Sequence, residues 1–145
     1  MNVENESQTR PICFVDSNIW LYTFLDGQDV KKSDLAKQAI QRNDTAISTQ
    51  VISEVCFNLI KKADFDEAKI RDLVNDFYSQ FTVMPINRRV LLKGSELRQR
   101  YNFSYWDSLI VACAMAANAT ILYSEDMDTS LVIEGRLQII NPLVR

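Results

Sequence analysis

The chain has 145 residues, of which 47% are hydrophobic and 24% charged, and its formal net charge is −3. This length suits one domain with its own hydrophobic core, and the composition is that of an ordinary globular protein. Because the sequence contains no histidine, it excludes Ser-His-Asp hydrolases, histidine-based acid–base catalysis and most zinc sites. The negative charge also argues against a protein that coats nucleic acid regardless of sequence.

The start of the chain has neither an apolar core nor a basic end, unlike a secretory signal. We expect residues 1–10 to be a disordered lead-in and residues 11–145 to form the domain. The longest apolar stretch, residues 109–117, is too short to span a bilayer. Three cysteines lie inside apolar runs without metal-ligand spacing, which favours buried free thiols and a cytoplasmic protein: Cys13, Cys56 and Cys113.

Short apolar runs alternate with helical patterns along the rest of the chain. The expected strands are residues 12–15, 46–48, 81–84, 120–123 and 137–140. The expected helices are residues 17–25, 33–42, a segment capped by Ser48 or Thr49, 66–80, 88–101, and a segment capped by Ser104 that runs to 118. Strands that alternate with helices indicate an α/β domain with a mainly parallel sheet.

Four acidic residues lie where apolar runs give way to polar breaks or helix starts. Asp16 and Asp126 follow the first and fourth expected strands, Glu54 lies early in the helix after the second, and Asp107 begins the helix before the fourth. Because the carboxyl ends of parallel strands share one edge of the sheet, we expect these acids to converge. Clustered carboxylates do not all stay ionised without a cation, and a hard divalent ion suits them. Metal-dependent phosphoryl chemistry is therefore the leading hypothesis.

Asp16 and Asp107 also have purely structural interpretations. Asp16 suits the N-cap of a helix that starts at Ser17. Asp107 stands three residues after Ser104, which is the spacing of a capping box.

Glu54 and Asp126 have ordinary interpretations as well. Glu54 suits a solvated edge of its helix, and Asp126 belongs to an acidic loop with Glu125 and Asp128. The hypothesis therefore depends on the set of four acids rather than on any one of them.

Four segments resemble the PIN domain family, and among its members the VapC-type toxins of prokaryotic toxin–antitoxin pairs. In chain order they read FVDSNIWLY (14–22), ISEV (52–55), YWDSLIVACA (105–114) and ILYSEDM (121–127), so the resemblance covers nearly the whole chain. It implies a PIN-like three-layer α/β/α domain around a mainly parallel five-stranded sheet. It also implies a Mg²⁺-dependent endoribonuclease, the toxin of a type II pair. The acidic pocket of that enzyme would consist of Asp16, Glu54, Asp107 and Asp126.

The resemblance further implies an RNA substrate, a small antitoxin partner and a homodimer, with no membrane association. Mg²⁺, or Mn²⁺ in its place, would lower the pKa of a bound water and stabilise charge as a P–O bond breaks. The fourth segment leaves its register open, with Asp126 favoured and Asp128 as the alternative. Ser17 and Ser124 are candidates to orient ligands or the phosphate, with helix capping or turn formation as their alternative roles.

Two other classes of function remain open from the sequence. One is a non-catalytic binding module with the same fold. The other is a phosphoaspartate hydrolase or receiver-type domain, which needs a lysine late in the chain, whereas the last lysine, Lys93, precedes the third and fourth acids. Aromatic residues near the third acid suit base stacking on RNA, or packing in the core or a dimer interface: Tyr101, Phe103, Tyr105 and Trp106.

Overall fold

The computed structural model describes residues 10–25 and 27–144. The expected lead-in therefore lies, except for Arg10, outside the described residues. Among the described residues, no helix is long and apolar enough to cross a membrane.

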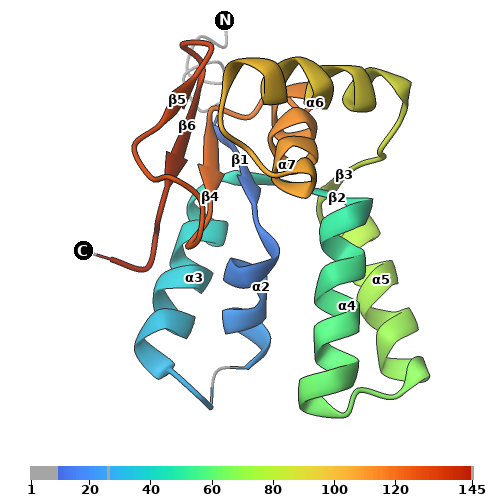
Figure 1. The fold of residues 1–145 in the computed structure, drawn as a ribbon. Coiled ribbons are helices and arrows are strands. Elements are labelled where there is room, and N and C mark those ends of the chain that lie inside the picture. Colours follow the sequence, from blue (N-terminus) through green and yellow to red (C-terminus); the bar gives the residue numbers. More distant parts are fainter. Residues whose placement is uncertain (1–9, 26, 145) are drawn as a thin grey trace, which may run out of the picture.

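A six-stranded sheet forms the centre of the described structure (Figure 1). Its strands are β1 (Ile12–Val15), β2 (Asp44–Ser48), β3 (Thr82–Met84), β4 (Ile121–Tyr123), β5 (Val132–Ile133) and β6 (Leu137–Ile140), in the spatial order β3-β2-β1-β4-β6-β5. All pairs are parallel except β5 with β6. The prediction of a mainly parallel sheet is confirmed.

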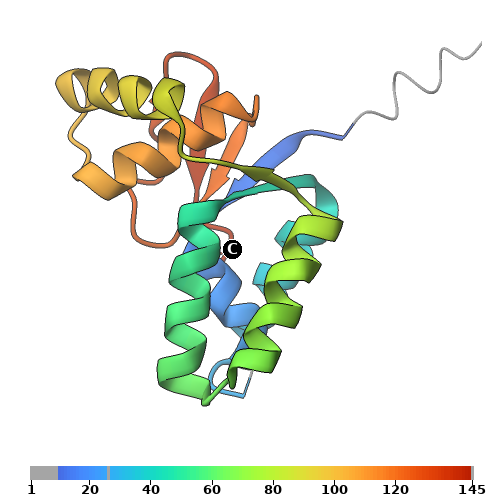
Figure 2. The same ribbon diagram turned by 90° about the vertical axis from the view of Figure 1, so that its right-hand side faces the viewer.

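Helices cover both faces of the sheet, which gives the three layers expected (Figures 1 and 2). The helices are α2 (Ser17–Phe24), α3 (Val30–Arg42), α4 (Thr49–Ala63), α5 (Glu67–Gln80), α6 (Arg88–Arg100) and α7 (Tyr105–Ala116). The first four lie on one side of the sheet, while α6 and α7 pack against each other on the other side.

Side-chain caps fix where these helices begin. Ser48, Asn87 and Ser104 each accept a hydrogen bond from a backbone N–H in the first turn, as expected of helix N-caps. One start was predicted wrongly, because α3 begins at Val30 and not at Ser33. Asp29 caps it through the N–H of Lys32, which adds three residues to the helix.

The central strand β1 is buried on both faces: Cys13, Phe14 and Val15 have no exposed surface. This agrees with the prediction from its continuous apolar run. The count of five strands was one short, because β5 was not predicted. Its two residues are too few for a periodic pattern, and a turn at Glu134 and Gly135, both with positive φ, folds them back onto β6.

The three cysteines are free thiols, as expected. Cys13 and Cys113 are buried and Cys56 is half-buried. Burial raises the pKa of each thiol, that of Cys113 to about 11. A thiol that keeps its proton is a poor nucleophile, so these cysteines serve as core residues.

Candidate active site

Asp16 lies at the carboxyl end of the central strand, where β1 leads into α2. Its backbone N–H donates to the carbonyl of Tyr123 at 2.9 Å, which extends the pairing of β1 with β4. Its side chain is only 6% exposed. Oδ1 accepts a hydrogen bond from the Ser17 N–H at 2.8 Å, and Oδ2 accepts one from the Ser124 hydroxyl at 2.8 Å. Both carboxylate oxygens are therefore held, and Asp16 also caps α2 as the sequence suggested.

Two other acids act electrostatically on Asp16. Burial raises the pKa of Asp16 from 3.8 to about 6, and the hydrogen bonds from Ser124 and Ser17 oppose that rise. The charges of Glu54 and Asp107 raise the pKa further. Two of the predicted acids, from two other segments, therefore act on Asp16 at this end of the sheet.

The fourth acid, Asp126, is joined to the first segment through Asn18. The Asn18 amide donates to Asp126 Oδ2 at 3.0 Å, and the Asn18 carbonyl oxygen accepts from the N–H of Glu125 at 3.4 Å. Asp126 and Asp128 are both exposed, but no hydrogen bond or ion pair joins the carboxylate of Asp128 to another described residue. The choice of Asp126 over Asp128 stays a prediction, although the contact with Asn18 favours it.

Glu125 has a different role in the same loop. Its Oε1 accepts from the Tyr22 hydroxyl at 2.9 Å, and its Oε2 forms an ion pair with Lys32 Nζ at 2.9 Å. Glu125 therefore anchors the loop to α2 and α3.

Glu54 and Asp107 are half-buried residues on different helices. Gln50 lies between their segments: its Nε2 donates to Glu54 Oε2 at 3.4 Å and to the carbonyl of Trp106 at 3.5 Å. The sequence analysis missed Gln50. Its spacing of four residues from Glu54 on one helix was the available signal, because such pairs share a helix face.

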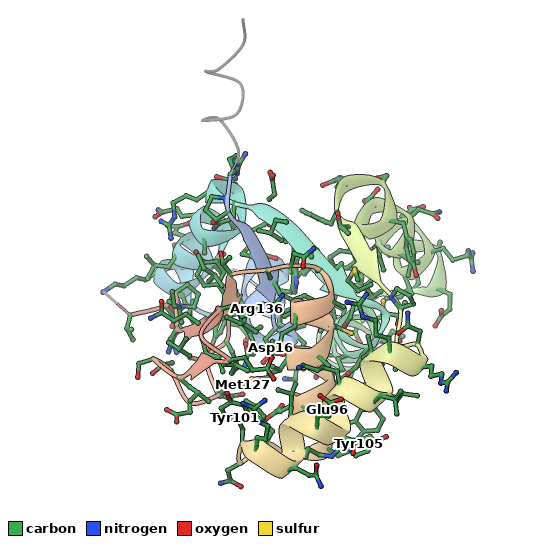
Figure 3. All side chains as sticks on the ribbon, turned by 90° about the horizontal axis from the view of Figure 1, so that it is seen from above. Asp16, Glu96, Tyr101, Tyr105, Met127 and Arg136 are labelled. Carbon is green, nitrogen blue, oxygen red and sulfur yellow. The ribbon has the colours of Figure 1, made fainter. Side chains whose placement is uncertain are left out.

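Ser124 is the second polar residue buried at this site. It has no exposed surface, and its hydroxyl both donates to Asp16 and accepts from the N–H of Met127 at 3.3 Å. Ser124 thus links Asp16 to the backbone of Met127, and both of these residues are labelled in Figure 3. Ser17 contributes its backbone N–H to Asp16.

The residues fit a divalent cation that keeps much of its water. Across residues 10–25 and 27–144, no three histidine, cysteine or acidic side chains lie close enough together to hold an ion among them. The acids are thus not a closed cage of ligands. Mg²⁺ usually binds one or two carboxylates and retains several waters, so an open set of carboxylate oxygens suits it. Burial is the main cause of the raised pKa of Asp16, and the charges of Glu54 and Asp107 add to it; a bound cation would favour the ionised form against both.

Comparison with known proteins assigns the chain to a family. The model of the PIN domain matches residues 13–133. No curated protein matches the chain.

Solved structures show the same fold at low sequence identity. A toxin–antitoxin complex from Klebsiella pneumoniae is 22% identical, with a TM-score of 0.67 over 90% of this chain and 97% of that one. VapC20 from Mycobacterium tuberculosis, a toxin that cleaves the sarcin–ricin loop, is 16% identical, with a TM-score of 0.65 over 80% and 91%. VapBC2 from Rickettsia felis, bound to a DNA fragment from its promoter, is 19% identical, with a TM-score of 0.63 over 90% and 98%. By its sequence match and its fold, the chain belongs to the PIN domain family.

Proposed function

We propose that this protein is a Mg²⁺-dependent endoribonuclease and the toxin of a type II toxin–antitoxin pair. The observation that supports this most is the burial of Asp16 at the end of β1 in a PIN domain, where the charges of Glu54 and Asp107 from other segments also act on it. A buried carboxylate at a strand end with other acids near it is typical of sites that use a metal ion.

The chain's own residues have definite roles in this proposal. Asp16, Glu54, Asp107 and Asp126 would hold Mg²⁺ or Mn²⁺, directly or through water. The bound ion supplies an activated water and stabilises charge on the phosphate. Ser124 keeps Asp16 oriented through its hydroxyl, and Asn18 does the same for Asp126. Gln50 lies between the second and third acidic segments and makes one long hydrogen bond to each.

The proposed partners follow from the structures with the same fold. One is a toxin–antitoxin complex, one cleaves an RNA loop, and one is a VapBC complex on DNA. We infer an RNA substrate, a small antitoxin that inhibits the enzyme, a homodimeric state and a cytoplasmic location.

A receiver-type or phosphoaspartate enzyme is disfavoured by the surroundings of Lys93. This residue, the last lysine of the chain, binds Glu134 at 2.8 Å and also lies 3.8 Å from Glu96. Lys93 is therefore paired with carboxylates on α6 and beside β5. A receiver-type or phosphoaspartate enzyme instead needs a lysine next to the phosphorylated aspartate.

The decisive experiment is cleavage of total RNA by the purified protein with Mg²⁺, with EDTA, and in the Asp16→Asn variant. We expect cleavage only by the unaltered protein with metal. Equal cleavage in EDTA would exclude the metal-dependent mechanism. A folded protein that binds RNA but never cuts it would instead support the non-catalytic binding module.

A further inference from the structure

A shallow hollow of about 470 Å³ adjoins the candidate active site. It is lined by residues of α4, of the segment after β3 and of the first turn of α7: Thr49, Gln50, Ser53, Glu54, Ile86 and Trp106. Its volume falls within the range of roughly 300–1,000 Å³ that is usual for small-molecule sites. One of its walls is Glu54, so whatever fills the hollow lies beside one of the four acids.

Trp106 is unusually exposed for a tryptophan of a folded domain. It is 58% exposed, whereas Trp20, the other tryptophan, is 4% exposed and packs against Phe77 in the core. The Tyr105 ring stands nearly perpendicular to Trp106, with 5.2 Å between ring centroids, and the Arg98 guanidinium lies 4.5 Å from the centroid of Tyr105. A supported indole with a solvent-facing surface is a suitable platform for stacking.

Gln50 lines the same hollow and carries an unsatisfied polar atom. The residue is 9% exposed, and its amide oxygen is buried without a hydrogen-bond partner. Its amide nitrogen makes two hydrogen bonds, but both are long, at 3.4 and 3.5 Å. Buried amides in proteins nearly always find partners, so an amide this poorly satisfied points to a partner outside the chain.

We propose that this hollow binds one unpaired base of the RNA, next to the phosphodiester bond that is cut. The inference rests on the proposed ribonuclease function. The base stacks on Trp106, and the Gln50 amide turns out of its two long hydrogen bonds to pair with the edge of the base. A base suits the hollow because it is flat, aromatic and uncharged beside Glu54, and its edge carries both donors and acceptors.

The test is a double-mutant cycle, in which one base of the RNA and one side chain of the protein are removed separately and together and RNA binding is compared. Asp16→Asn protein, which we expect to leave RNA uncut, is titrated with a short single-stranded RNA that contains the cleaved sequence. Matched RNAs each lack one base near the cut. Loss of one particular base is expected to weaken binding by roughly 5- to 140-fold, the range for stacking on an aromatic side chain. In the Asp16→Asn/Trp106→Ala protein the same base loss should have no further effect, and Gln50→Leu should reduce the base effect in part.

Tyr78→Ala is the matched control, because Tyr78 is 55% exposed on α5. This change should leave the effect of each base intact. Stacking should also quench the fluorescence of Trp106, and this quenching should disappear in Trp106→Phe, which retains only the buried Trp20.

Two results would overturn the inference while the ribonuclease stands. In the first, the unaltered protein cuts RNA, yet removal of any base weakens RNA binding by the same factor with and without the Trp106 side chain. In the other, Trp106→Ala converts a dimer to a monomer without changing the contribution of any base, which would make the hollow a contact between two copies of the chain. If the unaltered protein cuts no RNA, the proposed function fails and the subsite fails with it.

Discussion

The Ser124 hydroxyl donates a 2.8 Å hydrogen bond to Asp16 Oδ2, although 108 positions separate the two residues. The bond exists because β1 and β4 are parallel neighbours, with Val15 opposite Tyr123, so the residues that follow these strands meet. Both side chains are buried. The hydrogen bond favours the ionised form of Asp16 against the burial and the neighbouring acids that disfavour it.

Replacement of Asp16 by asparagine should abolish RNA cleavage and stabilise the metal-free protein at neutral pH. The native protein holds a proton on Asp16 up to pH about 6, whereas the unfolded chain releases it near 3.8. Stability from this group is therefore complete below pH 3.8 and is lost as the pH rises through 6. This loss lowers the free energy of unfolding by about 3 kcal/mol. Asparagine does not titrate and avoids the loss, although its amide forgoes any hydrogen bond that only the carboxylate can accept. Chemical denaturation in EDTA between pH 4 and 8 measures the difference.

The difference in stability between Asp16→Asn and the unaltered protein should depend on pH. The advantage of Asp16→Asn in the free energy of unfolding should grow between pH 4 and 6 and then level off. An advantage that does not depend on pH would mean that the native pKa of Asp16 is not raised.

Mg²⁺ or Mn²⁺ should raise the melting temperature, and EDTA should reverse the rise. An ion that binds only the native state stabilises it by about 2.7 kcal/mol at a hundredfold excess over Kd. Asp107→Asn should reduce the shift. Asp64→Asn should not, because Asp64 caps the far end of α4 and asparagine tolerates its positive φ. The same metal response in both variants would indicate nonspecific binding.

Asp126→Asn should reduce cleavage far more than Asp128→Asn. Both residues are exposed, but Asp126 accepts a hydrogen bond from Asn18, two residues after Asp16, whereas Asp128 has no partner among the described residues. Rates on one RNA substrate at saturating metal provide the measurement, with melting curves to show that both variants fold. The reverse ranking would move the fourth acid two residues along the loop.

Gly94→Ala should destabilise the protein by up to about 2 kcal/mol. A Cβ atom at position 94 would lie 2.9 Å from Cδ2 of Leu109, which is buried on α7 and has little room to move. The gain in helix propensity offsets part of this cost. Gly27→Ala is the control, because nothing lies within 4 Å of the added atom. Equal midpoints of urea denaturation for the two variants would show that α6 and α7 can separate without cost.

Local patterns explain why much of the fold was predictable. The continuous apolar run of β1 reflects burial on both faces, and the caps Ser48, Asn87 and Ser104 are satisfied by backbone groups within three residues. Because parallel strands end at one edge, the topology alone also predicted that Asp16 and Asp126 follow strands at the same edge of the sheet.

The features that were missed depend on contacts between distant segments. Gln50 gains its role from Trp106, 56 positions away, and Glu125 is paired with Lys32, 93 positions away. No spacing in a single segment records either contact. The strand β5 is defined by its pairing with β6, and its two residues contain no sequence pattern that predicts this pairing.

The position of β1 also sets the time during synthesis at which the site can form. β1 is the first of the described strands to be made, yet it lies between β2 and β4, and β4 begins only at Ile121. A nascent chain that has emerged as far as α6 still lacks Asp107, Asp126 and one neighbour of β1. The four acids therefore cannot assemble until β4 and the loop that follows it have left the ribosome, so the candidate site forms late in the synthesis of this domain.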